Sequence, residues 1–450
     1  MLFNTFTYLV FLPLVFIVYW GMARSKKEQN WIIVLSSFVF YGWWDVKCLF
    51  LMIATCTVNY VLVKLMERKD GIRKGLLYAA IILDFCILGT FKYFNFFADN
   101  LEIMLESIGI KADFPTLNII LPVGVSFYTF QLVGYVIDCY KRKIQVPHSF
   151  VDFIAFICFF PQLVAGPIER GNTMLAQLVT RRNFDFNQGR EGMRLILWGL
   201  VKKMLIADNC AVVVNYVFDN YTDVSLPDLW IGALCFTFQI YGDFSGYSDI
   251  AIGSAALLGV KLSTNFMKPF FSQDIPAFWR RWHITLMSWF KDYVYIPLGG
   301  SHRGVFRKHV NRTTVFLLSG LWHGSNWTFV AWGLYNALWF LIPHKWLTFI
   351  IVMIGFVIFR SPDIHYACDY ITNMFTPSLW GATTCSRMPL FLIAAFALVE
   401  WLMRDRQHPF SFSDKGLLAK QWVRIPLYIV IFLSVVLLGG ESSQFIYFQF

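Results

Sequence analysis

Long apolar runs separated by short polar loops dominate the chain. A helix that crosses a bilayer needs about 20 mostly apolar residues, and these runs are of that size. They are continuous and lack the period-2 alternation of a membrane β-barrel strand. The pattern therefore predicts an all-α polytopic membrane protein with about 10–12 spans, over residues 5–22, 31–47, 49–65, 76–94, 117–139, 150–166, 192–217, 228–258, 313–342, 346–360, 387–403 and 422–440.

The run 228–258 is too long for one simple span and carries polar residues over 240–250. Asp243 and Asp249 would each cost about 2.5–3.5 kcal/mol on a lipid-facing helix near the bilayer centre. We therefore expect this segment to be broken or bent, to face the protein interior, and to have partners for both carboxylates. The alternative is a pair of short helices around a polar turn at the membrane surface.

The segment 275–300 also departs from the pattern of a simple span. It mixes aromatic side chains such as Trp279 and Trp282 with charged ones such as Arg280 and Arg281. This mixture is typical of an interfacial or re-entrant helix.

Composition agrees with a membrane protein. Of the 450 residues, 57% are hydrophobic and only 15% are charged, whereas soluble domains average roughly 25% charged residues. Lipid solvates this apolar surface, which one soluble core could not hide. No hydrophilic stretch is long enough to fold separately, so we expect one membrane domain over residues 1–450.

The net charge of +10 is spread over short loops rather than over one basic face, so we expect no nucleic-acid partner. Loops 23–30, 66–75 and 140–149 are basic, and loop 95–116 is mostly acidic. Basic loops stay on the cytoplasmic side, which predicts an N-terminus outside. The nine cysteines are scattered without metal-ligand spacing, so we expect neither a metal site nor a disulfide framework.

His323 is the histidine with the strongest case for chemistry. It lies in an apolar run, between Gly320 and Gly324, and ionisable residues inside a membrane are functional candidates by default. A neutral imidazole suits proton abstraction near neutral pH. The alternative is a packed histidine bonded to a neighbouring carbonyl.

His283 follows the string FWRRW over residues 278–282. Adjacent arginines beside a histidine at membrane level could bind an anionic donor, because guanidinium pairs bidentately with phosphate. An interfacial belt of Trp and snorkelling Arg is the alternative. Fingerprints of hydrolases, P-loop proteins, zinc proteases and dinucleotide-binding proteins do not occur in a supporting context.

Four separated strings together resemble the membrane-bound O-acyltransferase family, and within it the branch of the alginate O-acetyltransferase membrane subunit. They are FPQLVAGPI at 160–168, YGDFSGYSDIAIG at 241–253, FWRRWH at 278–283 and SGLWHG at 319–324. The resemblance covers nearly the whole chain. One departure is the stretch from Phe340 to Phe359, where relatives are usually longer.

The resemblance implies a ring-like set of helices, including re-entrant or broken ones, around a central tunnel through a thin part of the membrane. By the same resemblance, His323 matches the catalytic histidine of the family and His283 the second active-site histidine. We expect the substrate or the tunnel to meet side chains from the same motifs, namely Trp279, Arg280, Arg281, Trp282, Trp322, Asp243, Asp249, Ser319 and Asn326.

The expected reaction moves an acyl group, here an acetyl group, from a cytoplasmic thioester to a cell-surface or secreted polysaccharide. Acetyl-CoA or another acyl thioester, such as one on an acyl-carrier protein, serves as substrate, and no cofactor is bound. The resemblance also implies an SGNH-like acyltransferase partner outside the membrane. The expected location is the bacterial cytoplasmic (inner) membrane, in contact with lipid.

Two rival functions fit part of the pattern. The related teichoic-acid branch transfers D-alanine, but the string at 164–167 and the opening residues favour the alginate branch. A transporter or flippase would use broken helices with buried carboxylates. Against a transporter, the sequence has no evident inverted repeat, and His323 would have no role.

Overall fold

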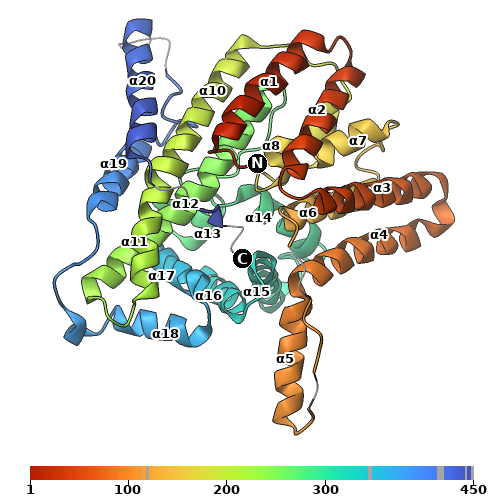
Figure 1. Cartoon of the computed structure of the whole chain (residues 1–450). Coiled ribbons are helices and arrows are strands. Elements are labelled where there is room, and N and C mark those ends of the chain that lie inside the picture. Colours follow the sequence, from red (N-terminus) through yellow and green to blue (C-terminus); the bar gives the residue numbers. More distant parts are fainter. Residues whose placement is uncertain (112, 118–120, 343–346, 413–419, 441–442, 447–450) are drawn as a thin grey trace. The chain divides into compact units, whose positions relative to one another are not determined.

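The computed structural model describes the chain except residues 112, 118–120, 343–346, 413–419, 441–442 and 447–450. Every regular element in these described parts is helical (Figure 1). The chain divides into two compact units: Met1–Phe184 with Leu258–Leu262, and Asp185–Leu257 with Ser263–Phe450. The expected all-α fold of a polytopic membrane protein is confirmed.

Several helices of the first unit begin close to the predicted starts of the apolar runs, at Phe6, Val46, Arg73 and Phe150, whereas the described part of the run 117–139 is helical only from Val125. Its α-helices are α1 (Phe6–Met22), α2 (Lys26–Gly42), α3 (Val46–Arg68), α4 (Arg73–Leu88), α5 (Phe94–Ser107), α6 (Val125–Tyr140), α7 (Phe150–Ile157), α8 (Phe160–Leu163) and α9 (Gly171–Leu178). A 3₁₀ turn η1 (Asp70–Ile72) precedes α4, and a π-helical segment η2 (Gly89–Tyr93) joins α4 to α5.

Polar side chains fix where the first helices start. The hydroxyl of Thr5 accepts a hydrogen bond from the Tyr8 N–H at the start of α1. Ser25 and Glu28 form a capping box on α2, and Asp45 caps α3. Such caps satisfy N–H groups that the helix itself leaves unpaired.

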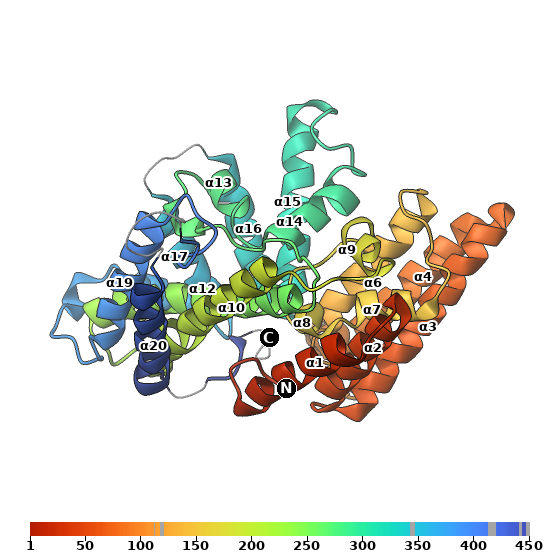
Figure 2. The ribbon, with the colours of Figure 1, turned by 90° about the horizontal axis from the view of Figure 1, so that it is seen from above.

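Helices α3 and α4 lie side by side in both views (Figure 1 and Figure 2), with α5 leaving the pair at η2. Asn59 of α3 donates a hydrogen bond to Asp84 of α4 at 2.7 Å, and both side chains are buried. An amide that meets the carboxylate reduces the cost of placing that group inside an apolar helix pair.

The second unit holds the remaining elements. Its α-helices are α10 (Phe186–Leu200), α11 (Asp208–Asp219), α12 (Leu226–Leu257), α13 (Ile275–Trp279), α14 (Ile284–Phe290), α15 (Gly304–His323), α16 (Trp327–Leu341), α17 (Thr348–Arg360), α18 (Ile364–Asn373), α19 (Met388–Leu402) and α20 (Gln421–Leu438). Shorter elements are the π-helical segments η3 (Val201–Ala207) and η5 (Lys291–Tyr295), and the 3₁₀ turns η4 (Pro269–Phe271) and η6 (Pro377–Leu379).

The expected break over 240–250 is wrong, because α12 runs as one helix of 32 residues from Leu226 to Leu257. Its glycines serve close packing instead. A Cβ on Gly246 would lie 2.7 Å from the carbonyl oxygen of Gly199 on α10, and a Cβ on Gly253 would lie 2.5 Å from that of Gly192. Small residues at such spacing let two membrane helices approach closely.

The expected partners of Asp243 and Asp249 on α12 are present, and Asp243 is buried whereas Asp249 is half-buried. Asp243 is ion-paired with Lys203 at 2.8 Å, and Asp249 with Lys202 at the same distance. Both lysines come from η3, where the π-helical turn displaces the chain from the regular helical course. Both lysines are visible in the sequence, but regular helical spacing does not show that they face the carboxylates of α12.

Two other predicted spans are divided. The run 150–166 forms the short helices α7 and α8, and the run 313–342 turns between α15 and α16. In the run 150–166, α8 begins at Phe160. Pro161 follows in the first turn of the helix, where a proline is tolerated. The run with His323, which was expected to form one span, is therefore interrupted between α15 and α16. Residues 118–120 of the run 117–139 and residue 346 of the run 346–360 lie outside the described residues.

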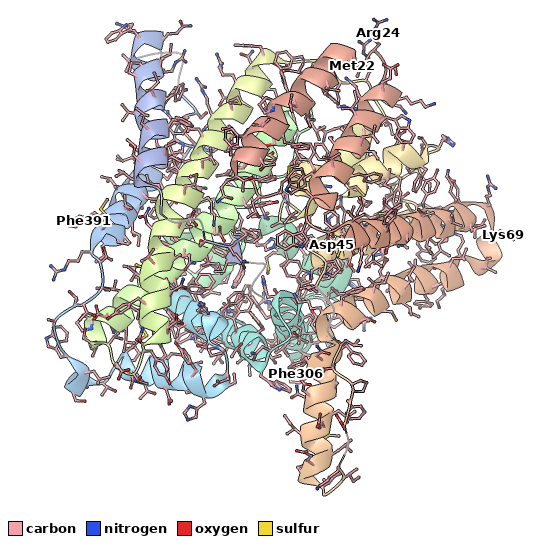
Figure 3. All side chains as sticks on the ribbon, in the orientation of Figure 1. Met22, Arg24, Asp45, Lys69, Phe306 and Phe391 are labelled. Atoms are coloured by element: carbon pink, nitrogen blue, oxygen red, sulfur yellow. The ribbon has the colours of Figure 1, made fainter. Side chains whose placement is uncertain are left out.

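Among the described residues, three helical runs are long and apolar enough to cross a membrane: Val46–Arg68, Asp70–Ser107 and Gln421–Leu438. The helices α1, α17 and α19 are apolar but shorter. These helices carry exposed apolar residues. One of them is Phe391 of α19, which is labelled in Figure 3. This surface is suited to lipid contact. The count of 10–12 spans, the ring and the tunnel stay predictions.

Candidate active site

His323 is the last residue of α15, and the chain turns there into α16. Two glycines make this turn compact: a Cβ on Gly324 would lie 2.0 Å from the Phe329 ring, and a Cβ on Gly320 would lie 2.2 Å from the Phe329 carbonyl oxygen. The glycines that flank His323 in the sequence therefore allow α16 to fold back against α15. This packing holds the histidine at a helix end inside the unit.

Aromatic rings surround the imidazole of His323. The ring centroids of Trp322, Trp332 and Phe359 lie 5.1, 5.3 and 5.3 Å from its own. The side chain is 5% exposed. A base in such surroundings works in a low-dielectric space from which bulk water is largely excluded.

His283 joins α13 to α14 and has a φ of 46°, in the left-handed region. Residues without a glycine's freedom seldom take this conformation unless their surroundings fix it, and such residues cluster at functional sites. The backbone is held by Asn265, whose carbonyl oxygen accepts a hydrogen bond from the Ile284 N–H at 2.9 Å. The side chain of His283 is 1% exposed.

Asn265 also determines which nitrogen of His283 carries the proton. Its Oδ1 accepts hydrogen bonds from the N–H and the hydroxyl of Thr285, at 3.2 and 2.9 Å, and lies 3.2 Å from His283 Nδ1. Because this oxygen is an acceptor, Nδ1 of the neutral ring carries the proton and donates. Nε2 is then the nitrogen with the lone pair.

The two histidines lie together although 40 residues separate them in the sequence. Their ring centroids are 6.5 Å apart, and Trp322 lies 5.7 Å from His283. Phe244, next to Asp243 on α12, packs on His283 at 4.7 Å. The expected closeness of the segment 240–250 to a histidine-bearing segment is thus confirmed.

The predicted neighbours of the histidines divide into buried and exposed residues. Trp279 and Trp282 are buried, and Trp279 lies 5.6 Å from Trp332, which itself contacts His323. Arg280 and Arg281, by contrast, are exposed. The arginines therefore lie outside the aromatic surroundings of the histidine pair.

Ser319 is buried in α15. Asn326 caps α16 by accepting a hydrogen bond from the Thr328 N–H, and it donates to the Pro362 carbonyl oxygen at 2.7 Å. Asn326 thus holds the turn after His323 in place. Its contacts are those of a structural residue.

Arg280 lines a groove of about 380 Å³ in the second unit. Trp279 and Phe316 contribute to its apolar wall, and Lys291 and Arg312 add two further cations. Trp279 belongs both to this wall and, through Trp332, to the rings around His323. The groove is suited to an anionic ligand with an apolar portion.

The end of the chain reaches the same region, which the sequence did not indicate. The N–H of Ile446 donates to Asp243 at 2.6 Å. Phe445 packs on Phe244 at 6.2 Å, and Phe244 contacts His283. This segment and Asn265 are the parts of the site that sequence reasoning missed. The sequence did carry a signal for the lysines of η3, because two adjacent cations inside an apolar run indicate buried charged partners.

Among the described residues, no group of three or more His, Cys, Asp or Glu side chains is placed to hold a metal ion. The string 160–168 belongs to the other unit, where Gly166 approaches the Gln162 backbone too closely for a Cβ.

Comparison with known proteins points to acyl transfer. Residues 140–379 match the membrane-bound O-acyltransferase family. A probable alginate O-acetylase AlgI of Pseudomonas putida is 34% identical, with 99% of each chain covered. A peptidoglycan O-acetyltransferase of Helicobacter pylori is also 34% identical, over 86% of this chain and 81% of the relative. A teichoic acid D-alanyltransferase of Bacillus subtilis is 27% identical, over 56% of this chain and 72% of the relative.

Proposed function

The chain belongs to the membrane-bound O-acyltransferase family and is an O-acyltransferase, and on this premise we propose that it transfers acetyl groups from a cytoplasmic thioester for O-acylation of a cell-surface or secreted polysaccharide. The observation that carries this proposal is the histidine pair. Two imidazoles from distant segments meet at 6.5 Å within a buried aromatic site. An acetyl group is favoured because the relatives that align over most of this chain are named O-acetylases or O-acetyltransferases.

In this reaction His323 takes the proton of an acceptor hydroxyl as its oxygen attacks the thioester carbonyl carbon. The carbon–sulfur bond then breaks, and the thiolate leaves and takes up a proton. General-base assistance of this kind contributes about 10²–10⁴-fold. The position of His323 at the C-terminus of α15 supports the role, because the negative end of the helix dipole stabilises the imidazolium formed.

His283 orients the reacting groups. Its Nδ1 hydrogen is directed to Asn265, so Nε2 can accept a hydrogen bond from the acceptor hydroxyl. The neutral ring in this form cannot donate to the oxygen of the thioester carbonyl. The role therefore differs from that of His323: His283 positions a hydroxyl, and His323 removes its proton.

The groove beside Trp279 supports a phosphate-bearing donor, either acetyl-CoA or the phosphopantetheine arm of an acyl-carrier protein. Arg280, Lys291 and Arg312 supply the cations, and guanidinium groups bind phosphate in a planar fork. Arg280→Lys keeps the charge and loses the fork, so we expect a raised KM for acetyl-CoA with kcat little changed. Unchanged kinetics would return Arg280 to the role of an interfacial anchor. Arg281→Lys serves as the neighbouring comparison.

Outside the membrane, the acetyl group passes to an SGNH-like acyltransferase partner that completes transfer to the polysaccharide. The proposed location is the bacterial inner membrane, with the N-terminus outside. The orientation is supported by the distribution of basic loops along the chain.

The proposal is tested with the purified chain in detergent, supplied with labelled acetyl-CoA, the partner enzyme and a polysaccharide acceptor. Transfer of label without a second compartment is expected of an enzyme and not of a transporter. D-alanyl thioester on a carrier protein is the comparison donor. Faster transfer of D-alanine than of acetyl would indicate that the chain is a D-alanyltransferase. Absence of transfer from both donors would contradict the proposal.

A further inference from the structure

Asp84 of α4 is a buried carboxyl group without a cation beside it. The buried Asp243 and the half-buried Asp249 on α12 are each ion-paired with a lysine of η3. Asp84 is 1% exposed, and in the part of the chain that the structure describes no Lys or Arg is placed to pair with it. Its contact there is a hydrogen bond from the amide of Asn59 on α3, at 2.7 Å. Asp84 is therefore neutralised in another way than the carboxylates of α12.

The depth of Asp84 in the membrane makes a free charge unfavourable. α4 begins with Arg73 and Lys74 and belongs to the helical run Asp70–Ser107, which is long and apolar enough to cross a bilayer. At about 1.5 Å per residue, Asp84 lies ~16 Å along α4. This places it near the middle of a hydrocarbon core of about 30 Å. Ionisable groups at such depth are paired or become neutral.

Two oxygen atoms of the contact between Asp84 and Asn59 have no donor. The Nδ2 group of Asn59 donates to Asp84 Oδ1 at 2.7 Å and to the Thr55 carbonyl oxygen at 3.0 Å. Because both of these oxygens accept, the Asn59 amide cannot be turned round. Asp84 Oδ2 and Asn59 Oδ1 are buried and receive no hydrogen bond. Buried acceptors without a donor are costly, so the contact lacks one donor group.

A single proton on Asp84 supplies this donor. A protonated carboxyl group has one O–H, which donates, and keeps an oxygen that accepts. With the proton on Oδ2, this O–H donates to Asn59 Oδ1, while Oδ1 of Asp84 still accepts from Asn59 Nδ2. The carboxylic acid and the amide then form a ring with two hydrogen bonds. The same proton removes the charge from the interior of the helix pair.

The groups that face Asp84 are consistent with a neutral carboxyl. Among the described residues, the titratable groups within electrostatic reach are Cys56 of α3 and Tyr128 of α6, and both are buried. A thiol and a phenol supply no positive charge. A metal ion is a poorer fit, because hard cations are held by about six or more oxygen atoms. The oxygens without a hydrogen bond here are those of Asp84, Asn59 and the Tyr128 hydroxyl.

We propose that Asp84 and Asn59 form a proton-binding site in the first unit, in which the protonated carboxyl is joined to the amide by two hydrogen bonds. The site makes the contact of α3 with α4 depend on pH. Loss of the proton leaves a buried carboxylate without a cation, and the first unit loses stability. The histidine pair belongs to the second unit, so the proton site is separate from the groups assigned to acyl transfer.

Infrared spectroscopy of the purified full chain in detergent tests the site directly. A protonated carboxyl group has its own carbonyl band, which shifts on exchange into D₂O. The unaltered chain at neutral pH should show such a band, and Asp84→Asn should lack it. Asp84→Asn is expected to fold, because the new amide can donate to Asn59 Oδ1 in place of the carboxyl O–H. Asp99→Asn, which changes an exposed carboxylate of α5, is the matched control and should keep the band.

The hydrogen bonds to Asn59 are tested by the frequency of the same band. Asn59→Ala removes the amide and leaves the carboxyl group without its partner. The carbonyl band should then move to higher frequency, because a hydrogen bond to the carbonyl oxygen lowers this frequency.

Thermal unfolding in detergent measures the consequence for stability. Because the folded chain holds the proton more tightly than the unfolded chain, the stabilisation is present at low pH and is lost as the pH rises through the titration of Asp84 in the folded chain. One proton changes the unfolding equilibrium constant by up to about tenfold per pH unit. The thermal midpoint of the unaltered chain should therefore fall with rising pH relative to that of Asp84→Asn. Exchange of Na⁺ for choline at constant pH should leave both midpoints unchanged.

Three results would contradict the proton site. They are a carboxyl band that Asp84→Asn retains, an equal pH dependence of the two thermal midpoints, and a midpoint of the unaltered chain that follows Na⁺ at constant pH. The last result would assign the two oxygens to a metal ion.

Discussion

His323 owes its position to the residues on either side of it. Gly320 and Gly324 leave space for Phe329, so α16 turns back where α15 ends. His283 owes its position to a contact from outside its own segment, the hydrogen bonds of Asn265. The first arrangement is local in the sequence, and the second is not.

Replacing His323 by Ala should reduce acetyl transfer by roughly 10²-fold or more, because a general base is lost. Thermal stability should change much less, since the variant retains the glycines and tryptophans that pack α15 on α16. Initial rates with labelled acetyl-CoA and a thermal midpoint in detergent measure the two effects. His365→Ala is the control, because His365 is an exposed residue of α18. Retention of more than about a tenth of the rate would exclude His323 as the base.

Asn265→Ala should lower kcat by roughly 10²-fold, because displacement of a reacting group by about 1 Å is enough for such a loss. The KM for donor should change little, as the donor groove contains no contact from Asn265. Steady-state kinetics separate the two constants. Thr285→Val is the comparison: it removes one hydrogen bond to Asn265 but leaves the bond to His283. Equal losses of kcat in both variants would indicate a general packing effect rather than a positioning role.

At the scale of helices, the central feature is the contact of α10, η3 and α12. Glycines on α10 and α12 bring the two backbones together. The π-helical turn of η3 presents Lys202 and Lys203 to the carboxylates of α12. Asp243 also accepts a hydrogen bond from the N–H of Ile446. Helix α12 can carry Asp243 and Asp249 and stay continuous here because η3 supplies their cations.

Lys203→Met should strongly destabilise the fold. It leaves Asp208 and Asp243 buried without their shared cation, and breaking a buried pair by removing one partner typically costs about 3–5 kcal/mol. The Lys202→Met variant should lose less, because Asp249 keeps more solvent contact than Asp243. The thermal midpoints of the two variants in detergent provide the comparison. A larger loss for Lys202→Met would contradict the ranking.

At the scale of the whole molecule, the question is which loops face the cytoplasm. Asp45 and Lys69 mark the two ends of α3 in Figure 3, with Lys69 at the turn into α4. Met22 and Arg24 mark the turn from α1 to α2 in the same view. The basic ends of these helices are expected inside, because cytoplasmic loops retain Lys and Arg.

Single-cysteine labelling should report this orientation. Loops 23–30, 66–75 and 140–149 should be protected from an impermeant reagent on intact cells, and loop 95–116 should react. The background must lack the native cysteines, of which Cys86 and Cys368 are exposed. Disruption of the membrane before labelling is the control for accessibility. Labelling at 66–75 without labelling at 95–116 would invert the orientation.

The sequence by itself determined the class of fold and the reaction class. Apolar runs of spanning length predict helices, because backbone polar groups in lipid must be satisfied within the segment. Motifs around His283 and His323 indicated acyl transfer. The carboxylates of α12 predicted partners, because unpaired charges inside a membrane are costly. The reaction class came from the resemblance of these motifs to a known family, and the other two conclusions came from local pattern and composition.

Only the tertiary structure decided how these parts meet. The glycines of 240–250 were consistent either with a break in the helix or with close packing of two helices. The contact of α12 with α10 shows that they serve close packing. Asn265 and Ile446 had no local pattern to mark them, because their roles consist of contacts across long stretches of chain. The physical reason is that propensity and periodicity act within one element, whereas pairing of charges and orientation of an imidazole depend on which elements pack together.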